Sequence, residues 1–376
     1  MNRLGVFAFY DKEGIVDEYV YKLLDGIVPF LGRLIIVCNG KISDEGKSRF
    51  GLYAEDIVIR ENVGYDAGAY KDCIIQLHET GELDVYDELL LFNNSFFGPF
   101  YPLESIFSKP NIEPDIDFWG ITEHPGGVIG DDKYPISAHI QSYFLLVTKR
   151  LLYSEEFMQF WYELDYTRSH LETVKKFEVR FSTYFRERGF IGKSIYDVAD
   201  IGIKLQEDCN PYTYYSYQLV KHLKMPFLKI TSLFVEAEDC VNAIAAMNYL
   251  EQNGLYSKEY IVNYMQRVAD QKPYFNYYKL DVFCQRYRKI YIYGAGKYGS
   301  RMERYLKHCG YDIKGFIVSQ KSNEAKDVVT MKEINIDRET GIIVALGREN
   351  TKQVMKSLIS RIEPEQLFVG KYEMIK

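Results

Sequence analysis

Short apolar runs alternate with helical segments over roughly the first 150 residues. This alternation favours an α/β fold. The strand-like runs are almost entirely apolar, so we expect a sheet that is covered on both faces, as parallel sheets are. The expected strands are residues 4–10, 33–39, 56–60, 88–93, 117–122 and 140–148. We therefore predict a parallel-rich, twisted sheet flanked by helices.

The chain beyond this region contains a helical part and then a second α/β part. Apolar residues recur at helical spacing over 154–189, and Ser154 is a typical helix N-cap. After the segment QKPYFNYY, strand-like and helical segments alternate again, as in a small Rossmann-like domain. We predict a first domain at 1–270, a linker at 271–287 and the Rossmann-like domain at 288–376.

Composition narrows the class of protein. A chain of 376 residues with 47% hydrophobic residues can bury two globular cores. The net charge of -7 argues against broad nucleic-acid binding, which needs clustered Lys and Arg. Six cysteines without CxxC spacing indicate neither a zinc site nor a disulfide framework. Neither a signal-peptide pattern nor an uncharged apolar run of roughly 18 residues occurs, so we expect a cytoplasmic location.

A glycine-rich turn opens the predicted C-terminal domain. Gly294, Gly296 and Gly299 form a GxGxxG pattern that follows a strand and begins a helix, which is the context of a phosphate-binding turn. However, Ser319 and Gln320 stand at the end of the next strand, where a dinucleotide site would carry an acid for the ribose. Binding of some phosphate and a tightly packed turn without a ligand both remain open.

Four segments, in the same order, resemble the rhamnan synthesis F family of bacterial polysaccharide glycosyltransferases. They are RENVGYDAGAYKDCI, YDELLLFNNSFFGPFYPL, DFWGITEH with HIQSYFLLVTKRLL, and NPYTYYSYQLVKHLKMPFLKI. The likeness covers roughly residues 4–234. It implies a GT-A-like fold and transfer of a sugar, with rhamnose as one candidate, from a nucleoside-diphosphate donor to a cell-surface polysaccharide.

The resemblance and the chemistry both direct attention to the turn after the third strand. Asn62 and Asp66 are short polar residues at the carboxyl end of a strand, where open α/β sheets bind ligands. Gly64 and Gly68 are expected to let the backbone approach the donor closely. The structural alternative is a turn in which Asp66 caps the following helix.

The FNNS segment stands where GT-A enzymes usually carry an acidic, metal-binding motif. Asn93, Asn94 and Ser95 offer amides and a hydroxyl instead, and the acid common in the family is replaced by Asn94. We therefore predict no metal site made by the protein alone. Mg²⁺ or Mn²⁺ would be held mainly by the donor phosphates, or the phosphate charge would be met by Lys, Arg or helix N-termini.

An inverting transfer needs a base for the acceptor hydroxyl. FEVRFSTYFRERGF resembles the acidic helix start that carries this base in many GT-A enzymes, which makes Glu178 the candidate, with Asp66, Asp117 and His139 in reserve. In SAHIQSYFLL, strand alternation puts His139 and Gln141 on one face and Ser142 on the other. These two residues are expected to contact the sugar or the acceptor. The expected donor contacts are Tyr10, Asn62, Asp66, Gly68, Asn93, Asn94, Ser95 and Lys229.

Two other functions compete with this prediction. The missing acid at Asn94 would suit a catalytically silent carbohydrate-binding or scaffold protein. The glycine turn would suit an NAD-dependent sugar oxidoreductase, although the absent ribose acid disfavours it. For a glycosyltransferase, the expected acceptor is a lipid-linked saccharide, reached through peripheral association with the inner membrane face or with partner glycosyltransferases.

Overall fold

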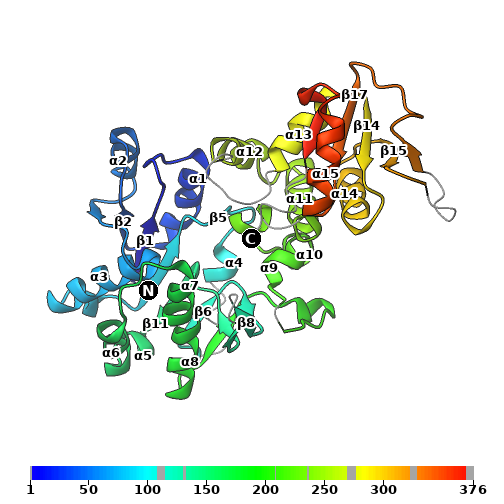
Figure 1. The fold of residues 1–376 in the computed structure, drawn as a ribbon. Coiled ribbons are helices and arrows are strands. Elements are labelled where there is room, and N and C mark those ends of the chain that lie inside the picture. Colours follow the sequence, from blue (N-terminus) through cyan, green and yellow to red (C-terminus); the bar gives the residue numbers. More distant parts are fainter. Residues whose placement is uncertain are drawn as a thin grey trace. The chain divides into compact units, whose positions relative to one another are not determined.

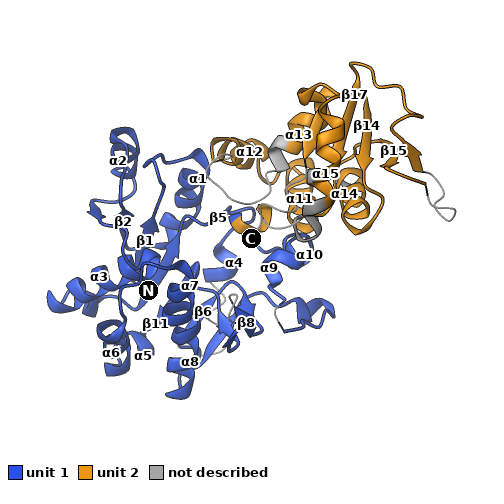
Figure 2. Cartoon of the chain, in the orientation of Figure 1, with its two compact units in different colours: residues 1–230 blue, residues 231–376 orange. Residues whose placement is uncertain are grey.

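The structure is a computed structural model that describes residues 2–107, 115–129, 133–207, 209–234, 237–268, 277–321 and 328–369. The chain forms two compact units, Met1–Ile230 and Thr231–Lys376 (Figure 2).

A seven-stranded sheet forms the centre of the first unit (Figure 1). The strand order is β12-β6-β11-β4-β1-β2-β3. Strands β1 to β4 pair in parallel, and β11 is antiparallel to both of its neighbours. The bounds are β1 Arg3–Phe9, β2 Arg33–Asn39, β3 Asp56–Arg60, β4 Glu88–Asn93, β6 Phe118–Gly120, β11 Phe144–Thr148 and β12 Gly192–Ser194. The predicted α/β fold with a parallel-rich sheet is confirmed.

Helices accompany this sheet. The longer ones are α1 Glu18–Ile27, α2 Asp44–Phe50, α3 Tyr65–Glu79, α6 Glu155–Glu163 and α8 Arg180–Glu187. The predicted N-cap is present, since Ser154 accepts a hydrogen bond from the backbone N–H of Phe157 at the start of α6. A π-helical segment, η4 Val174–Val179, connects α7 (His170–Thr173) to α8.

Alternate residues of β1 serve opposite faces of the sheet. Val6 belongs to a buried cluster that also contains Tyr70 of α3 and Trp161 of α6. On the other face, the ring of Phe7 lies 6.2 Å from the ring of Phe50 at the end of α2. Both faces therefore pack against apolar side chains, which explains why the strands are continuous apolar runs rather than alternating ones.

The predicted strand 140–148 is interrupted. It consists of β10 (His139–Ile140) and β11, and residues 141–143 between them leave the ladder. The other short elements of this unit are β5 Phe96–Phe97, β7 Glu123–His124, β8 Gly127–Ile129, β9 Tyr134–Ile136, β13 Leu228–Lys229, η1 Val28–Phe30, η2 Leu83–Val85, η5 Val198–Ile201, α4 Glu104–Phe107, α5 Lys149–Leu152, α9 Pro211–Tyr214 and α10 Ser216–Lys221.

The second unit contains a five-stranded parallel sheet in the order β16-β15-β14-β17-β18. The predicted small Rossmann-like α/β fold is thus confirmed. Its strands are β14 Lys289–Tyr293, β15 Ile313–Val318, β16 Val328–Thr330, β17 Thr340–Val344 and β18 Leu367–Val369. Its helices are η6 Ile230–Leu233, which begins at the unit boundary, α11 Ala237–Gln252, α12 Lys258–Arg267, α13 Tyr277–Arg286, α14 Lys297–His308, α15 Arg348–Leu358 and η7 Pro364–Gln366.

Helices α11 and α12 group with this second sheet, because the division between the units falls after Ile230. The boundaries expected from the sequence, at 270 and 288, stay a prediction about folding domains. Part of the predicted linker, 271–276, lies outside the described residues. Among the helices that are described, none is both long and apolar enough to cross a membrane.

Candidate functional site

Polar residues gather where the parallel strands of the first unit end. The carboxyl ends of β1, β2, β3 and β4 meet at one edge of the sheet because these strands run in the same direction. The antiparallel strand β11 begins at this edge, since Phe144 pairs with Phe92 near the end of β4. Segments that are far apart in the sequence are therefore brought together here.

A hydrogen-bonded chain links four of the predicted donor contacts. Lys229 Nζ donates to Ser95 Oγ at 2.5 Å. The hydroxyl and the backbone N–H of Ser95 both donate to Asn93 Oδ1, the latter at 3.1 Å. Asn93 Nδ2 donates to Asp66 Oδ2 at 2.8 Å. All four residues are partly exposed, so solvent can reach this series of hydrogen-bonded side chains.

The turn before α3 is held by two residues at the ends of neighbouring strands. Arg60 donates to Asn39 Oδ1 at 2.6 Å and to the carbonyl of Val63 at 2.9 Å. Asn39 Nδ2 in turn donates to the carbonyl of Tyr65 at 2.8 Å. Tyr65 has a φ of 55°, which is uncommon for a residue with a side chain. These bonds fix the start of α3 beside Asn93.

The glycines of this turn serve its packing. Gly64 has a φ of 77° and is the N-cap of α3, so Asp66 is not the cap. A Cβ at Gly68 would lie 2.2 Å from the carbonyl oxygen of Val63, so close packing against the preceding turn accounts for this glycine. Its donor contact stays a prediction. Asn62, by contrast, has a buried Oδ1 with no hydrogen-bond partner among the described residues.

Asn94 uses its amide to join the ends of β1 and β4. Its Oδ1 accepts from the backbone N–H of Tyr10 at 3.1 Å, and its Nδ2 donates to the Tyr10 carbonyl at 3.0 Å. The hydroxyl of Tyr19 donates to the carbonyl of Asn94 at 2.7 Å. A carboxylate could not make the second of these bonds. The missing acid thus has a structural reason. The Tyr10 side chain is 48% exposed beside it.

Glu178 lies in the π-helical segment η4 and faces the break between β10 and β11. Its Oε2 accepts from the backbone N–H and the hydroxyl of Ser142, at 2.8 and 2.6 Å. Its Oε1 lies 3.5 Å from His139 Nε2. The predicted alternation, with His139 and Ser142 on opposite faces, is wrong because the chain leaves the strand after Ile140. Both residues contact Glu178.

His139 and Glu178 shift each other's pKa. The Nδ1 of His139 lies 2.7 Å from the carbonyl of Ser137, which can only accept, so this nitrogen carries a proton. Burial acts to lower the pKa of His139, but the carboxylate of Glu178 outweighs this effect and raises it. Burial acts to raise the pKa of Glu178, but His139 and the bonds from Ser142 outweigh it and lower the pKa.

The charge of Glu178 also shifts the pKa values of Asp66 and Lys229. Burial raises the pKa of Asp66, and the charge of Glu178 adds to the rise, although the hydrogen bond from Asn93 and the charge of Lys229 oppose it. Burial lowers the pKa of Lys229 to about 8, against the charges of Glu178 and Asp66. Lys229 Nζ also lies 4.3 Å from the centre of the Tyr143 ring.

Two other candidates are buried within the protein. Gln141 is 2% exposed, and its Oε1 accepts from the hydroxyl of Thr122 at 2.7 Å. Asp117 is 1% exposed and forms a two-point ion pair with Arg150. Since Phe118 pairs with Val147, towards the end of β11, Asp117 lies at the edge of the sheet opposite Asn93. Asp117 is therefore not part of the cluster.

The glycine turn of the second unit contains two kinds of glycine. A Cβ at Gly299 would lie 1.8 Å from the carbonyl oxygen of Gly294, and one at Gly294 would lie 2.6 Å from that of Ala345. A Cβ at Gly296 would meet nothing within 4 Å. Ser319 lies within hydrogen-bond distance of the Tyr293 hydroxyl, at 3.0 Å. Packing accounts for two of the three glycines, and phosphate binding stays a prediction.

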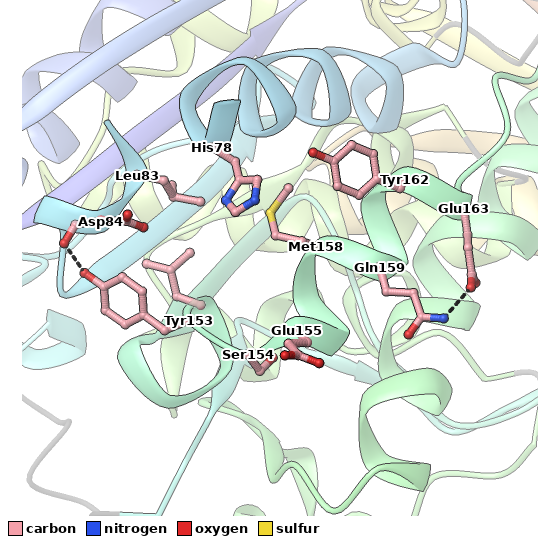
Figure 3. A pocket seen from close by; sticks show the side chains of 11 residues that line it. His78, Leu83, Asp84, Tyr153, Ser154, Glu155, Met158, Gln159, Tyr162 and Glu163 are labelled. Atoms are coloured by element: carbon pink, nitrogen blue, oxygen red, sulfur yellow. Dashed lines mark hydrogen bonds between the residues drawn. The ribbon is translucent and has the colours of Figure 1, made fainter. Parts of the chain in front are cut away.

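A separate surface pocket of about 460 Å³ lies in the first unit (Figure 3). It is formed by the end of α3, by η2 before β4, and by α5 and α6, with Leu83 and Met158 among its lining residues. Tyr153 borders it and donates to the carbonyl of Asp84 at 2.6 Å (Figure 3). None of the predicted site residues lines this pocket.

The cluster at the sheet edge does not fit a metal ion held by protein ligands alone. Within the described ranges, no group of three or more His, Cys, Asp or Glu side chains could hold a metal. Both polar atoms of the Asn94 amide and the Oδ1 of Asn93 already have protein partners. Asp66 and Glu178 remain as partly exposed carboxylates, but Glu178 already accepts from Ser142 and lies beside His139, whereas Mg²⁺ and Ca²⁺ prefer several oxygen ligands.

Fold and cluster together define an α/β protein with a polar site at the carboxyl edge of a mainly parallel sheet. A family model described as rhamnan synthesis protein F matches residues 34–289, more than half of the chain. This protein therefore belongs to that family.

Individual relatives are more distant. The uncharacterized protein y4gN of Sinorhizobium fredii is 24% identical over 205 residues, which cover 53% of this chain and 49% of that protein. The chain thus spans about half the length of this curated relative.

Solved structures with some similarity include two enzymes. One is 4-diphosphocytidyl-2C-methyl-D-erythritol synthase of Anaerococcus prevotii, 16% identical over 55% of this chain and 94% of that chain, with a TM-score of 0.35. The other is core-mannan synthase A of Aspergillus fumigatus in its Mn/GDP form, 9% identical over 46% and 69%, with a TM-score of 0.26. Likenesses as distant as these do not define an activity.

Sequence reasoning did not find every residue of the site. Asn39 and Arg60 could have been noticed, because both are polar residues at the ends of adjacent parallel strands and pair with each other in the sheet. Ser142 could not, since its contact with Glu178 depends on a break inside an apolar run that looks like one strand.

Proposed function

We propose that this protein is a GT-A-like glycosyltransferase that transfers a sugar from a nucleoside-diphosphate donor to a hydroxyl group of a growing cell-surface polysaccharide. The observation that carries the proposal is the hydrogen-bonded chain from Lys229 through Ser95 and Asn93 to Asp66. It lies at the carboxyl edge of the sheet, where α/β proteins bind nucleotides. Membership of the rhamnan synthesis protein F family supports polysaccharide synthesis and makes rhamnose the first sugar to test.

The donor would lie across the ends of β1, β3 and β4. The exposed ring of Tyr10 offers a flat surface for the nucleobase. The diphosphate would lie against Ser95, Lys229 and the N-terminus of the 15-residue helix α3. Gln141 and His139 would support the sugar side of the site from behind, because both are buried.

The reaction requires one bond to form and one to break. The acceptor oxygen bonds to the anomeric carbon from the face opposite the diphosphate, and the bond from that carbon to the diphosphate oxygen breaks with its electron pair left on the oxygen. The proton of the acceptor hydroxyl passes to a carboxylate.

Two carboxylates in the cluster differ in their suitability as this base. A general base works best when its pKa is close to the working pH. The pKa of Asp66 is raised, whereas that of Glu178 is lowered by its partners. We therefore propose Asp66 as the proton acceptor. Glu178, the base expected from the sequence, is better suited to keeping His139 charged and in place.

Two competing functions have less support. The amide of Asn94 has a structural task, so the absent acid does not argue for a silent scaffold protein. Gly294 and Gly299 have packing reasons, which weakens the case for an NAD-dependent oxidoreductase. A lipid-linked acceptor and peripheral association with the cytoplasmic face of the membrane remain part of the proposal through the family resemblance.

Binding of donors tests the proposal directly. Thermal-shift and calorimetric titrations of the full chain with UDP-, GDP- and dTDP-sugars should identify a donor that raises the melting temperature, because the ligand binds only the native state. Hydrolysis or transfer of that donor should then be measurable. If no sugar nucleotide or nucleoside diphosphate binds, the proposal is wrong.

A further inference from the structure

We propose that the surface pocket formed by α3, η2, α5 and α6 is a second saccharide site, which holds a neutral stretch of the acceptor polysaccharide away from the donor site (Figure 3). The choice of a saccharide as the occupant rests on the proposed function. The pocket itself shares no residue with the predicted donor site.

The pocket is formed before any ligand binds. Its volume of about 460 Å³ lies within the range of roughly 300–1,000 Å³ that is usual for small-molecule sites. Leu83 and Met158 line it and are buried. Tyr153 is fixed at its border, because its hydroxyl donates to the carbonyls of Asp84 and Tyr86 at 2.6 and 2.8 Å. A ligand would therefore meet apolar walls that are already in place.

Two exposed aromatic rings border the pocket. Tyr153 is 40% exposed and Tyr162 is 49% exposed. In Figure 3, His78 and Met158 lie between these two rings. The ring centre of His78 lies 6.5 Å from that of Tyr162, in an edge-on arrangement. Exposed rings suit a flat ligand that combines apolar faces with a polar edge, as a sugar ring does.

Polar groups without protein partners stand beside these rings. The imidazole of His78 and the carboxylates of Asp84 and Glu155 make no hydrogen bond or ion pair in the part of the chain that the structure describes. A carboxylate can only accept a hydrogen bond, whereas a neutral imidazole both donates and accepts. Sugar hydroxyls can serve both kinds of group.

The charge of the pocket excludes an anionic ligand. Three of its lining residues are acidic, and none is Lys or Arg. Two cations beside it are already paired, Arg180 with Glu163 and Lys149 with Asp87. A nucleotide or a lipid phosphate would therefore be repelled, and a neutral saccharide would not. A cationic peptide would be attracted as well, so the test below includes one.

The pocket lies well away from the cluster at the carboxyl edge of the sheet. His78 and Asp66 are on the same helix, α3, and are separated by about 18 Å along its axis. A saccharide in the pocket is therefore too far from Asp66 to react. A long acceptor chain bound here would stay attached to the protein while its growing end enters and leaves the donor site.

The test is a calorimetric titration of the full chain in the absence of nucleotide. The probes are neutral tetrasaccharides of rhamnose, mannose, glucose and galactose, together with tetralysine. We expect at least one tetrasaccharide to bind with an affinity that does not change between low and high salt, because a neutral ligand has no charge to screen. Tyr162→Ala should weaken this binding by about fivefold or more, and Tyr162→Phe should retain most of it because the ring remains.

A matched control is Tyr134→Ala. It removes a tyrosine of similar exposure, 46%, from β9 of the same unit, and Tyr134 does not line the pocket. Its affinity for the tetrasaccharide should equal that of the parent protein. Melting curves of each variant check the fold.

The outcomes are separable. Salt-independent tetrasaccharide binding that is weakened in Tyr162→Ala and not in Tyr134→Ala supports the inference. The inference is overturned if no tetrasaccharide binds, if Tyr162→Ala binds it as the parent does, or if tetralysine alone binds and is released by salt. Titration of Tyr162→Ala with sugar nucleotides judges the proposed function separately, because donor binding does not involve this pocket.

Discussion

The side-chain amide of Asn94 bridges the ends of two parallel strands, and both of its polar atoms are needed for this bridge. An acid at this position would keep the bond from the backbone N–H of Tyr10. It would lose the bond to the Tyr10 carbonyl and place negative charge beside that oxygen. Asn94, which replaces the acid expected at this position, is thus the residue that links the end of β4 to the end of β1.

We therefore predict that Asn94→Asp lowers the free energy of unfolding by about 0.5–1.5 kcal/mol, because the hydrogen bond to the Tyr10 carbonyl is lost and a repulsive contact replaces it. Urea unfolding at neutral pH measures the change. Asn253→Asp is the control: the Asn253 side chain is exposed and donates one bond to Tyr249, so its cost should stay below about 0.5 kcal/mol. Equal stability of Asn94→Asp and the parent would show that the bridge is unimportant.

The rate of transfer should depend on pH differently if the base is Asp66 than if it is Glu178. A base must be deprotonated, so with Asp66 the rate should fall as the pH drops through its raised pKa, at a higher pH than for an ordinary aspartate. Asp66→Asn should lower kcat by about 100-fold or more, and Glu178→Gln should lower it less and keep the acidic limb of the pH profile. If Glu178→Gln abolishes transfer while Asp66→Asn retains the acidic limb, Glu178 is the base.

The ion pair of Glu178 with His139 should make stability depend on pH. The lowered pKa of Glu178 contributes stability above the ordinary Glu pKa and loses it as the pH falls through the folded pKa. The raised pKa of His139 contributes stability below the ordinary His pKa and loses it as the pH rises through the folded pKa. The ion pair therefore stabilises the folded protein at pH values between the folded pKa of Glu178 and the folded pKa of His139.

Glu178→Gln should thus cost about 2–4 kcal/mol at about pH 6 and less at about pH 9, because the charge of His139 is lost as the pH rises through its folded pKa. Chemical denaturation at the two pH values measures the difference. Arg180 lies two residues further along the chain, at the start of α8, and Arg180→Gln, which removes its exposed ion pair with Glu163, should show no such pH dependence.

At the scale of elements, the helix that carries Glu178 changes its winding where the site needs it. Six residues, Val174–Val179, form a π-helical segment between two α-helices. Such segments are rare and are often found at functional sites. Here the segment presents Glu178 to Ser142 and His139 while Phe177 and Val179 remain buried.

The two glycine turns offer a test at this scale. Gly68→Ala and Gly299→Ala should each lower the free energy of unfolding by about 1–3 kcal/mol, because the new Cβ would meet a backbone oxygen at 2.2 and 1.8 Å respectively. Gly296→Ala, with open space around its Cβ, should change stability by less than about 0.5 kcal/mol. Thermal unfolding compares the three. If Gly68→Ala leaves the free energy of unfolding unchanged, close packing against Val63 does not explain this glycine.

At the scale of the whole molecule, the sequence predicts the sheets well, because strands buried on both faces stand out as continuous apolar runs. Strands β2, β3 and β4 have the bounds expected from the sequence. The break after Ile140 was not predictable, because residues 140–148 are apolar enough to read as one strand. The helices α11 and α12 show no sequence signal for the unit to which they belong.

The site was predictable only in part, for a related reason. Asp66, Asn93 and Ser95 stand at strand ends, and topology alone brings strand ends together. The pairing of Glu178 with His139 and Ser142 depends on local winding and on a strand break, which no periodicity encodes. The task of Asn94 depends on which backbone atoms face it, and only coordinates reveal that.

The pairing of β13 with β5 sets an order in which the site can be completed. Lys229 follows Ser95 by 134 positions, and its Nζ reaches that hydroxyl only after the last short strand of the first unit has docked. During synthesis, the strands that carry Asp66 are made well before Lys229, so the edge of the sheet would have its carboxylate before its ammonium group. A protein that ends just before β13 would keep the seven-stranded sheet, but the site at its edge would carry the charge of Asp66 without that of Lys229 and would repel anions.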